Sequence, residues 1–231
     1  MSNQGEKGSM AFRWIGWADN DYIAARLLLL NDVLAQGSAL IQGSSLSNTA
    51  IEKYLKALFV HLDLKIPKGF KGHDVSNLYG EIKKKGITLD ISEDYLAMLF
   101  KSYRLRYPDL NPGDNFILCK TKLLVELDRT VYVIRSGFSF ESKGEKIKTR
   151  IEELKEKNNP ILLDKNCYFG NYNRAALFQE KSPCYELRIE KNGVPIEEFI
   201  YRSRINDDGK FDAEALKPNG KGTYQMGEWP K

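Results

Sequence analysis

The residue types best suited to contact a phosphate or a base gather in one short segment, 104–109. Arg106 offers a planar guanidinium that can donate two hydrogen bonds to a phosphate, and Tyr107 offers an aromatic face on which a base can stack. Pro108 interrupts a helix and would expose both side chains. A local ion pair between Arg106 and Asp109 would explain the same residues without any ligand, so the pattern supports both interpretations.

Two lysines and a histidine are the other candidates. Lys53 and Lys56 are three positions apart and would project together from one helix face, where they could meet Arg104 and hold phosphate. Glu52 is four positions from Lys56, so the same residues could simply form a surface ion pair. His73 could lock a loop by hydrogen bonds, whereas proton transfer would require a second polar group within hydrogen-bonding reach.

Helical periodicity predicts five amphipathic helices that position these residues. They run over Phe12–Ala35, from Ser44 or Ser47 to Leu62, over Val75–Lys85, from a cap at Ser92 through Tyr103 into segment 104–109, and over Asp114–Ser136. Asp74 and Ser92 are natural N-caps, and Gly86 ends the third helix. Five such helices with short connections predict a mainly α fold, an up-and-down bundle over residues 11–140.

The pattern changes after the bundle. Residues 141–160 are highly charged and predict an exposed helix or a connector. Within 161–231, Tyr185–Glu190 alternates apolar and polar residues, Asn192–Gly193 is a strong hairpin-turn signal, and Val194–Arg202 continues as an extended segment. We therefore predict a small C-terminal extension that contains a β-hairpin.

Three sequence elements together resemble HEPN domains, a family of nucleotide- and RNA-associated proteins. Asn48–Leu58, with its Glu-Lys-Tyr-Leu-Lys-Ala-Leu core, is similar to the helix-two signature of that family. Gly72–Val75, followed by Leu78, resembles the turn into helix three, and Tyr103–Asp109 resembles the element that ends helix four. The resemblance implies a homodimer formed through the long helices, a nucleotide or RNA in the cleft at their seam, and a separately encoded nucleotidyltransferase as a possible partner protein.

The chain departs from the ribonucleases of that family in one respect. They share an arginine followed, four to six residues later, by a histidine, and neither Arg104 nor Arg106 has a histidine at that spacing. An arginine alone can stabilise an oxyanion, but it cannot move the proton of an attacking hydroxyl. We therefore predict a binding module that is non-catalytic or weakly catalytic. The residues predicted to line its cleft are Lys53, Lys56, His73, Arg104, Arg106 and Tyr107.

Two alternatives stay open. The first is a toxin-like, metal-independent endoribonuclease of the kind found in toxin–antitoxin systems, in which His73 acts with Arg106. The second is a protein-interaction scaffold, in which the hairpin around Asn192–Gly193 offers an edge to which a partner adds a strand.

Composition excludes several other classes. With 42% hydrophobic and 29% charged residues and a net charge of +4, the chain has the composition of a globular protein. No apolar run reaches the roughly 18 to 20 residues that cross a bilayer, and the polar segment Met1–Met10 does not resemble a signal peptide. We therefore expect a cytoplasmic protein with no membrane partner.

Motifs for metals and cofactors are also missing from the sequence. It contains no phosphate-binding loop, no dinucleotide-binding glycine pattern and no zinc-protease motif. The cysteines, Cys119, Cys167 and Cys184, lack the spacing of zinc or redox sites, which favours reduced thiols. We expect no metal and no cofactor.

Overall fold

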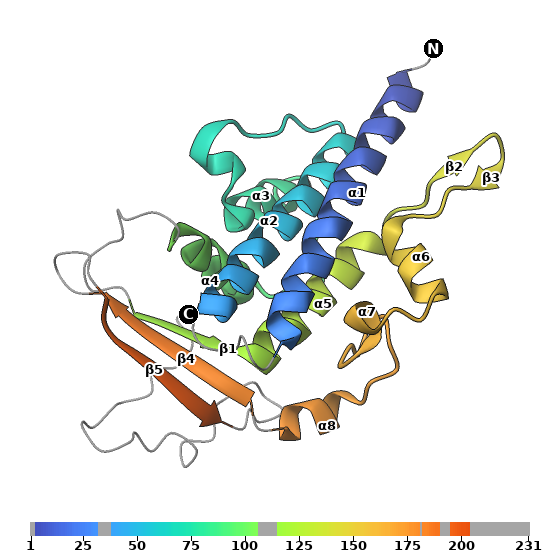
Figure 1. Ribbon diagram of the computed structural model, residues 1–231. Helices are drawn as coiled ribbons and strands as arrows, with labels where there is room; N and C mark the ends of the chain where they lie inside the picture. The colour runs from blue at the N-terminus through green and yellow to red at the C-terminus, as the bar shows by residue number, and fades with distance from the viewer. Residues whose placement is uncertain (1–2, 32–37, 106–114, 181, 190–194, 204–231) are drawn as a thin grey trace.

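A bundle of helices forms the centre of the molecule (Figure 1). The computed structural model describes residues 3–31, 38–105, 115–180, 182–189 and 195–203. The bundle consists of α1 (Asn3–Leu30), α2 (Ser38–His61), α3 (Val75–Lys83), α4 (Glu93–Arg104) and α5 (Lys120–Arg135). α1 and α2 lie antiparallel and share the most extensive interface, and the predicted mainly α fold is confirmed. None of the helices within these ranges is long and apolar enough to span a membrane.

The apolar stripes predicted from periodicity form the core of the bundle. The buried members of these stripes on the two long helices are Ala18, Tyr22, Ala25, Leu29, Ile51, Tyr54, Leu55 and Leu58. Burial of one large apolar side chain contributes roughly 1.5–3 kcal/mol, so these two stripes supply a large part of the driving force for packing α1 on α2.

Side-chain caps begin α3 and α4 where the sequence predicted. The Asp74 carboxylate accepts hydrogen bonds from the backbone N–H groups of Ser76 and Asn77, at 3.0 and 3.1 Å. The Ser92 hydroxyl accepts one from the N–H of Tyr95 at 3.1 Å. A cap of this kind contributes about 1 kcal/mol and fixes the first residue of its helix.

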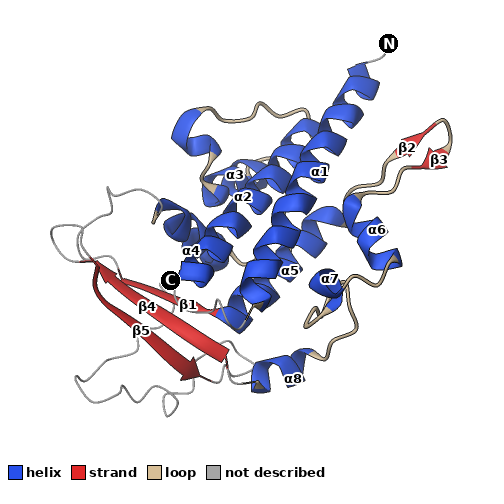
Figure 2. Cartoon of the chain, viewed as in Figure 1, coloured by secondary structure: helices blue, strands red, loops and turns tan. Residues whose placement is uncertain are grey.

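A small antiparallel sheet lies at one end of the bundle, as Figure 2 shows. Within the described residues, β1 (Asn115–Cys119), β4 (Ser182–Ile189) and β5 (Pro195–Ser203) are paired in the order β1-β4-β5. The predicted β-hairpin is therefore confirmed as β4 and β5, although its Asn192–Gly193 turn lies outside the described residues. The predicted helix over Asp114–Ser136 was wrong in its first turn, because residues 115–119 pair with β4 and α5 begins only at Lys120.

The strand pairing also corrects the interpretation of one cysteine. Cys119 is disulfide-bonded, and the register of β1 and β4 places its Cα opposite that of Cys184. Cys167 is a free thiol. The prediction of reduced thiols was therefore wrong for Cys119, because the pairing joins residues that are far apart in sequence.

Residues after the bundle pack back onto it. They form the short hairpin β2 (Glu141–Ser142) and β3 (Glu145–Lys146) and the helices α6 (Arg150–Glu156), α7 (Pro160–Leu163) and α8 (Arg174–Gln179). Ile151, Leu154 and Leu162 are buried in the same hydrophobic core as the long helices. Segment 141–160, predicted as a charged connector or helix, contains a helix whose apolar side contributes to that core.

A buried ion pair strengthens this attachment. Arg26 of α1 and Asp128 of α5 form a salt bridge with both side chains almost fully buried. The Arg26 guanidinium also donates to the backbone carbonyls of Ile161, at 2.7 Å, and Asp164, at 2.5 Å. One arginine therefore joins the two bundle helices to the segment around α7.

Candidate functional site

The backbone of His73 is held from three directions. Its N–H donates to the carbonyl of Phe70 at 3.0 Å, and its carbonyl accepts from the side-chain amide of Asn48 at 3.3 Å. Asp74, the next residue, caps α3. The preceding 3-10 helix, η1 (Gly69–Gly72), needs a glycine at its end, because a Cβ on Gly72 would lie 2.5 Å from a backbone carbonyl oxygen.

Glu52 connects His73 to Lys56. Glu52 Oε2 lies 3.1 Å from His73 Nδ1, and Lys56 Nζ donates to Glu52 Oε1 at 2.6 Å. The side chains of Glu52 and Lys56 are only 7% and 11% exposed, whereas that of His73 is 48% exposed. We name Asn48, Glu52, Lys56 and His73 the His73 cluster: a buried ion pair that supports a half-exposed imidazole.

The predicted pairing of Glu52 with Lys56 is confirmed, but the pair is buried rather than at the surface. Lys56 Nζ also lies 5.5 Å from the centre of the Trp14 ring on α1, a distance at which a cation–π interaction is favourable. Both contacts hold the lysine inside the structure. Lys56 is therefore placed to neutralise Glu52 from within the fold.

Lys53 is directed to a different partner. Its Nζ pairs with Asp21 Oδ2 of α1 at 2.5 Å, and both side chains are about one-quarter exposed. The two lysines predicted to project together thus both face α1, but they contact different groups there. Lys53 is next to Glu52 in sequence, but its partly exposed charge is paired with Asp21 and not with the His73 cluster.

Arg104 is the last residue of α4, and its neighbour Tyr103 contacts the cluster directly. The rings of Tyr103 and His73 are nearly parallel, with centroids 6.2 Å apart and an angle of 12° between their planes. Arg104 is partly exposed and has no ion-pair partner within the described residues. A guanidinium without a carboxylate partner is therefore one residue from the ring that stacks on His73. The other two predicted lining residues, Arg106 and Tyr107, lie outside the described residues.

The arrangement is suited to hydrogen bonding by one nitrogen of the imidazole. A carboxylate next to Nδ1 favours the tautomer with its proton on that atom, which leaves the Nε2 lone pair to accept a proton or a hydrogen bond. The side chain is 48% exposed, so part of the ring is open to a ligand. The cluster can thus bind a polar group, and the second polar group required for proton transfer is present as Glu52.

Sequence reasoning did not identify Asn48, Glu52 and Tyr103 as parts of the site. A signal for the first two was present, because Asn48, Glu52 and Lys56 are spaced by four residues and must share one face of α2. Polar residues at three successive turns of one helix face indicate either an exposed face or a buried polar cluster. Only the tertiary structure decides between them, and it buries all three.

The HEPN domain model matches residues 11–126, which is half of the chain. The matched region contains most of α1, the whole of α2, α3 and α4, and the whole His73 cluster. No curated protein and no solved structure matches the chain. The resemblance found in the three sequence elements is therefore confirmed by the family comparison.

Proposed function

Because the chain belongs to the HEPN domain family, we propose that its helical domain is a non-catalytic module that binds a nucleotide or RNA at the surface around His73. HEPN domains have nucleotide- and RNA-related functions. The observation that carries the proposal is the half-exposed imidazole, which is fixed by a buried carboxylate and stacked on Tyr103. The next residue, Arg104, has no ion-pair partner among the residues that the structure describes.

The ligand's phosphate and base require different groups. Arg104 and Arg106 supply guanidinium donors for phosphate oxygens, and Lys53 adds positive charge at the edge. Tyr107 supplies a ring on which a base can stack. His73 contributes a hydrogen bond through Nε2, while Lys56 acts from beneath by holding Glu52 in place.

Binding of end-labelled single-stranded and structured RNA, measured by fluorescence anisotropy in EDTA, tests this site. Arg104→Gln should weaken binding about fivefold, the equivalent of roughly 1 kcal/mol, and reduce the slope of log K against log salt by about 1. Lys101→Gln is the matched control, because Lys101 is an exposed cation one turn earlier on α4. Equal losses in both variants would show a general charge effect and exclude the site.

A homodimer formed through α1 is part of the proposal. The exposed large apolar residues Met10, Trp17 and Leu27 are each at least half exposed on this helix. Met10 and Trp17 are seven residues apart and share one face of α1, and exposed apolar side chains grouped on one helix face favour an interface. Light scattering should give a dimer for the wild type and a monomer for Trp17→Glu, whereas Phe70→Glu, at an exposed aromatic residue in η1, should remain dimeric. A monomeric wild type would refute this part.

We propose a separately encoded nucleotidyltransferase as the partner protein. We also propose that the protein resides in the cytoplasm. The redox state of Cys119 tests the compartment, because stable disulfides are rare in a reducing cytoplasm. In a reducing cytoplasm the disulfide of Cys119 should be open, so alkylation of acid-quenched cells should label Cys119. A disulfide retained under these conditions would place the protein in an oxidising compartment.

Metal-independent ribonuclease activity is a second candidate, favoured specifically by the contact between Glu52 and His73. A carboxylate beside Nδ1 is the arrangement that orients an imidazole for general acid–base catalysis, and the sequence alone did not show that His73 has such a partner. RNA cleavage in EDTA that is lost in His73→Gln would establish this function. No cleavage by the wild type would leave the binding module.

A further inference from the structure

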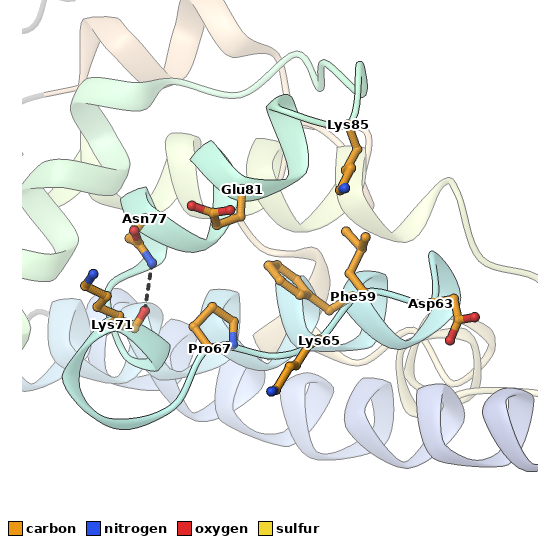
Figure 3. A pocket seen from close by; sticks show the side chains of 9 residues that line it. Phe59, Asp63, Lys65, Pro67, Lys71, Asn77, Glu81 and Lys85 are labelled. Atoms are coloured by element: carbon orange, nitrogen blue, oxygen red, sulfur yellow. Dashed lines mark hydrogen bonds between the residues drawn. The ribbon is translucent and has the colours of Figure 1, made fainter.

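A pocket between the end of α2, η1 and α3 carries charges of both signs. Figure 3 shows the Glu81 carboxylate between Lys71 and Lys85, and Asp63 also lines the pocket. Phe59, another lining residue, is only 2% exposed, so it offers little apolar surface to a ligand. A lining of mixed charge favours neither an anion nor a cation, and the pocket therefore selects no class of ligand.

The outer edge of the sheet, in contrast, has a definite charge pattern and no partner strand among the residues that the structure describes. β5 is paired with β4 on one side only. In Figure 1, β1 lies next to the helices and β5 lies on the side of the sheet away from them. An edge strand presents a row of backbone N–H and C=O groups that can hydrogen-bond to a further strand.

Two charged residues occupy one face of this edge strand. Successive residues of a strand alternate between its faces, so Glu198 and Arg202 share a face of β5. The β4 residues that lie opposite this face are uncharged, and they are Pro183, Tyr185 and Leu187. Glu198 and Arg202 therefore have no charged residue opposite them within the hairpin.

A second copy of β5 supplies the missing opposite charges. Hydrogen-bonded and non-hydrogen-bonded pairs alternate along an antiparallel ladder, so a two-fold axis between identical strands must pass beside a residue that faces its own copy. An axis at Ile200 places Glu198 of each copy opposite Arg202 of the other. The same register places Phe199 opposite Tyr201. Opposite charges and aromatic rings directly across two strands both stabilise a sheet.

The same charges disfavour the neighbouring two-fold registers. An axis at Glu197 or Glu198 would place a carboxylate opposite its own copy, and like charges directly opposite each other are destabilising. An axis at Phe199 or Tyr201 would place Arg202 opposite an isoleucine. Charges on an edge strand commonly prevent unwanted pairing, and in β5 they disfavour these registers and permit the one centred on residue 200.

We propose that β5 pairs antiparallel with β5 of a second copy of this chain, in the register centred on Ile200, and that this joins two three-stranded sheets into one. Because β5 ends at Ser203, the register pairs residues 197–203 of each copy. This is longer than β1, whose five residues are sufficient for its pairing with β4. The interface is separate from α1 and from the surface around His73, and the inference does not depend on the functions proposed for them.

Sedimentation equilibrium of full-length Trp17→Glu tests this pairing in the absence of the α1 interface. One strand pair buries less than the roughly 1,200 Å² of a stable interface, so we expect dimers at about 0.1–1 mM. Light scattering at micromolar concentration therefore reports on α1 alone. In the Trp17→Glu background, Glu198→Arg and Arg202→Glu should each weaken the dimer about tenfold or more, because each places like charges opposite each other twice. The variant with both exchanges should regain the dimer.

Glu186→Arg is the matched control for Glu198→Arg. It makes the same change of charge on the central strand β4, where Glu186 lies opposite the uncharged residues Ile117 and Phe199. The dimer should keep its affinity in this variant. Equal weakening by Glu186→Arg and Glu198→Arg, or no recovery when both charges are exchanged, would overturn the proposal.

Cysteine cross-linking tests the register itself. In a Cys167→Ser background, which removes the free thiol, Ile200→Cys should cross-link two copies under mild oxidation. Directly opposed Cα atoms in an antiparallel pair are about 4.5–5.5 Å apart, which is within disulfide range. Glu198→Cys should not cross-link, because its Cα would lie at least roughly 13 Å from its copy. Equal yields at the two positions, or no cross-link at position 200, would contradict this register. A Trp17→Glu variant that stays monomeric at about 1 mM would refute the pairing and leave the edge of β5 to a different chain.

Discussion

Glu52→Gln tests whether a buried charge supports the His73 cluster. The substitution keeps the shape of the side chain but leaves the Lys56 ammonium, 11% exposed, without its anion. Removing one partner of a buried ion pair costs about 3–5 kcal/mol. Because Lys56 keeps a small exposed area and its contact with the Trp14 ring, we expect the lower part of that range or slightly less, about 2–3 kcal/mol.

Equilibrium unfolding in urea, followed by circular dichroism, measures this loss. With an m value of about 2–3 kcal/mol/M, the midpoint should fall by roughly 1 M. Glu81→Gln is the control, because Glu81 also pairs with a nearby lysine, Lys84 at the C-cap of α3, but at the surface, and its midpoint should not move. The double variant Glu52→Gln with Lys56→Met should recover much of the stability, because no charge is left unpaired. A midpoint for Glu52→Gln equal to that of Glu81→Gln, or no recovery in the double variant, would refute the reasoning.

Acid sensitivity, loop geometry and the buried arginine can each be tested by one substitution. Burial raises the pKa of Glu152, but hydrogen bonds, of which that from Lys146 has the largest effect, outweigh burial and lower the pKa from 4.5 to about 2. Because the pKa is lower in the folded state, the ionised carboxylate stabilises the fold above pH 4.5, and this stabilisation is lost as the pH falls toward 2. Glu152→Gln should therefore flatten the dependence of the melting temperature on pH between 4.5 and 2. Gly72→Ala should destabilise the fold by about 1–3 kcal/mol, because its Cβ would clash with a carbonyl, whereas Gly80→Ala, in open space within α3, should stabilise it by about 0.5–1 kcal/mol in urea unfolding. Asp128→Asn should cost about 3–5 kcal/mol in the same assay, because its arginine partner stays buried and charged.

Local pattern was sufficient to predict the helices and their caps. The helical spacing of Ala18, Tyr22 and Leu29 predicts which face of α1 is buried, because all three apolar residues on that face are buried in the structure. Asp74 caps α3 through N–H groups two and three residues away, so its role is also encoded locally. Interactions within a few residues are the ones that a sequence pattern can show.

Long-range pairing was not predictable in the same way. Residues 115–119 carry an apolar run that fits either a helix or a strand, and the deciding partner, β4, begins at residue 182. Likewise, Glu52 and Lys56 have the spacing of a surface ion pair, and their burial depends on α1 and on the loop that carries His73. Lys56 and His73 were both predicted as lining residues, and the structure joins them through Glu52, which the sequence did not single out.

The arrangement of charges also favours binding over catalysis at His73. In a catalytic pair, the carboxylate stabilises the imidazolium that forms when the ring accepts a proton. Here the Lys56 ammonium, at 2.6 Å, already neutralises Glu52, so less of its negative charge is available to stabilise a positive ring. The same ammonium does not prevent Glu52 from orienting the ring by a hydrogen bond at Nδ1. A ring that is held in a fixed orientation, but whose positive form is stabilised less, suits a hydrogen-bonding group in a binding site better than a proton carrier. Lys56→Met should therefore strengthen any proton-transfer activity that His73 has, while it weakens the fold.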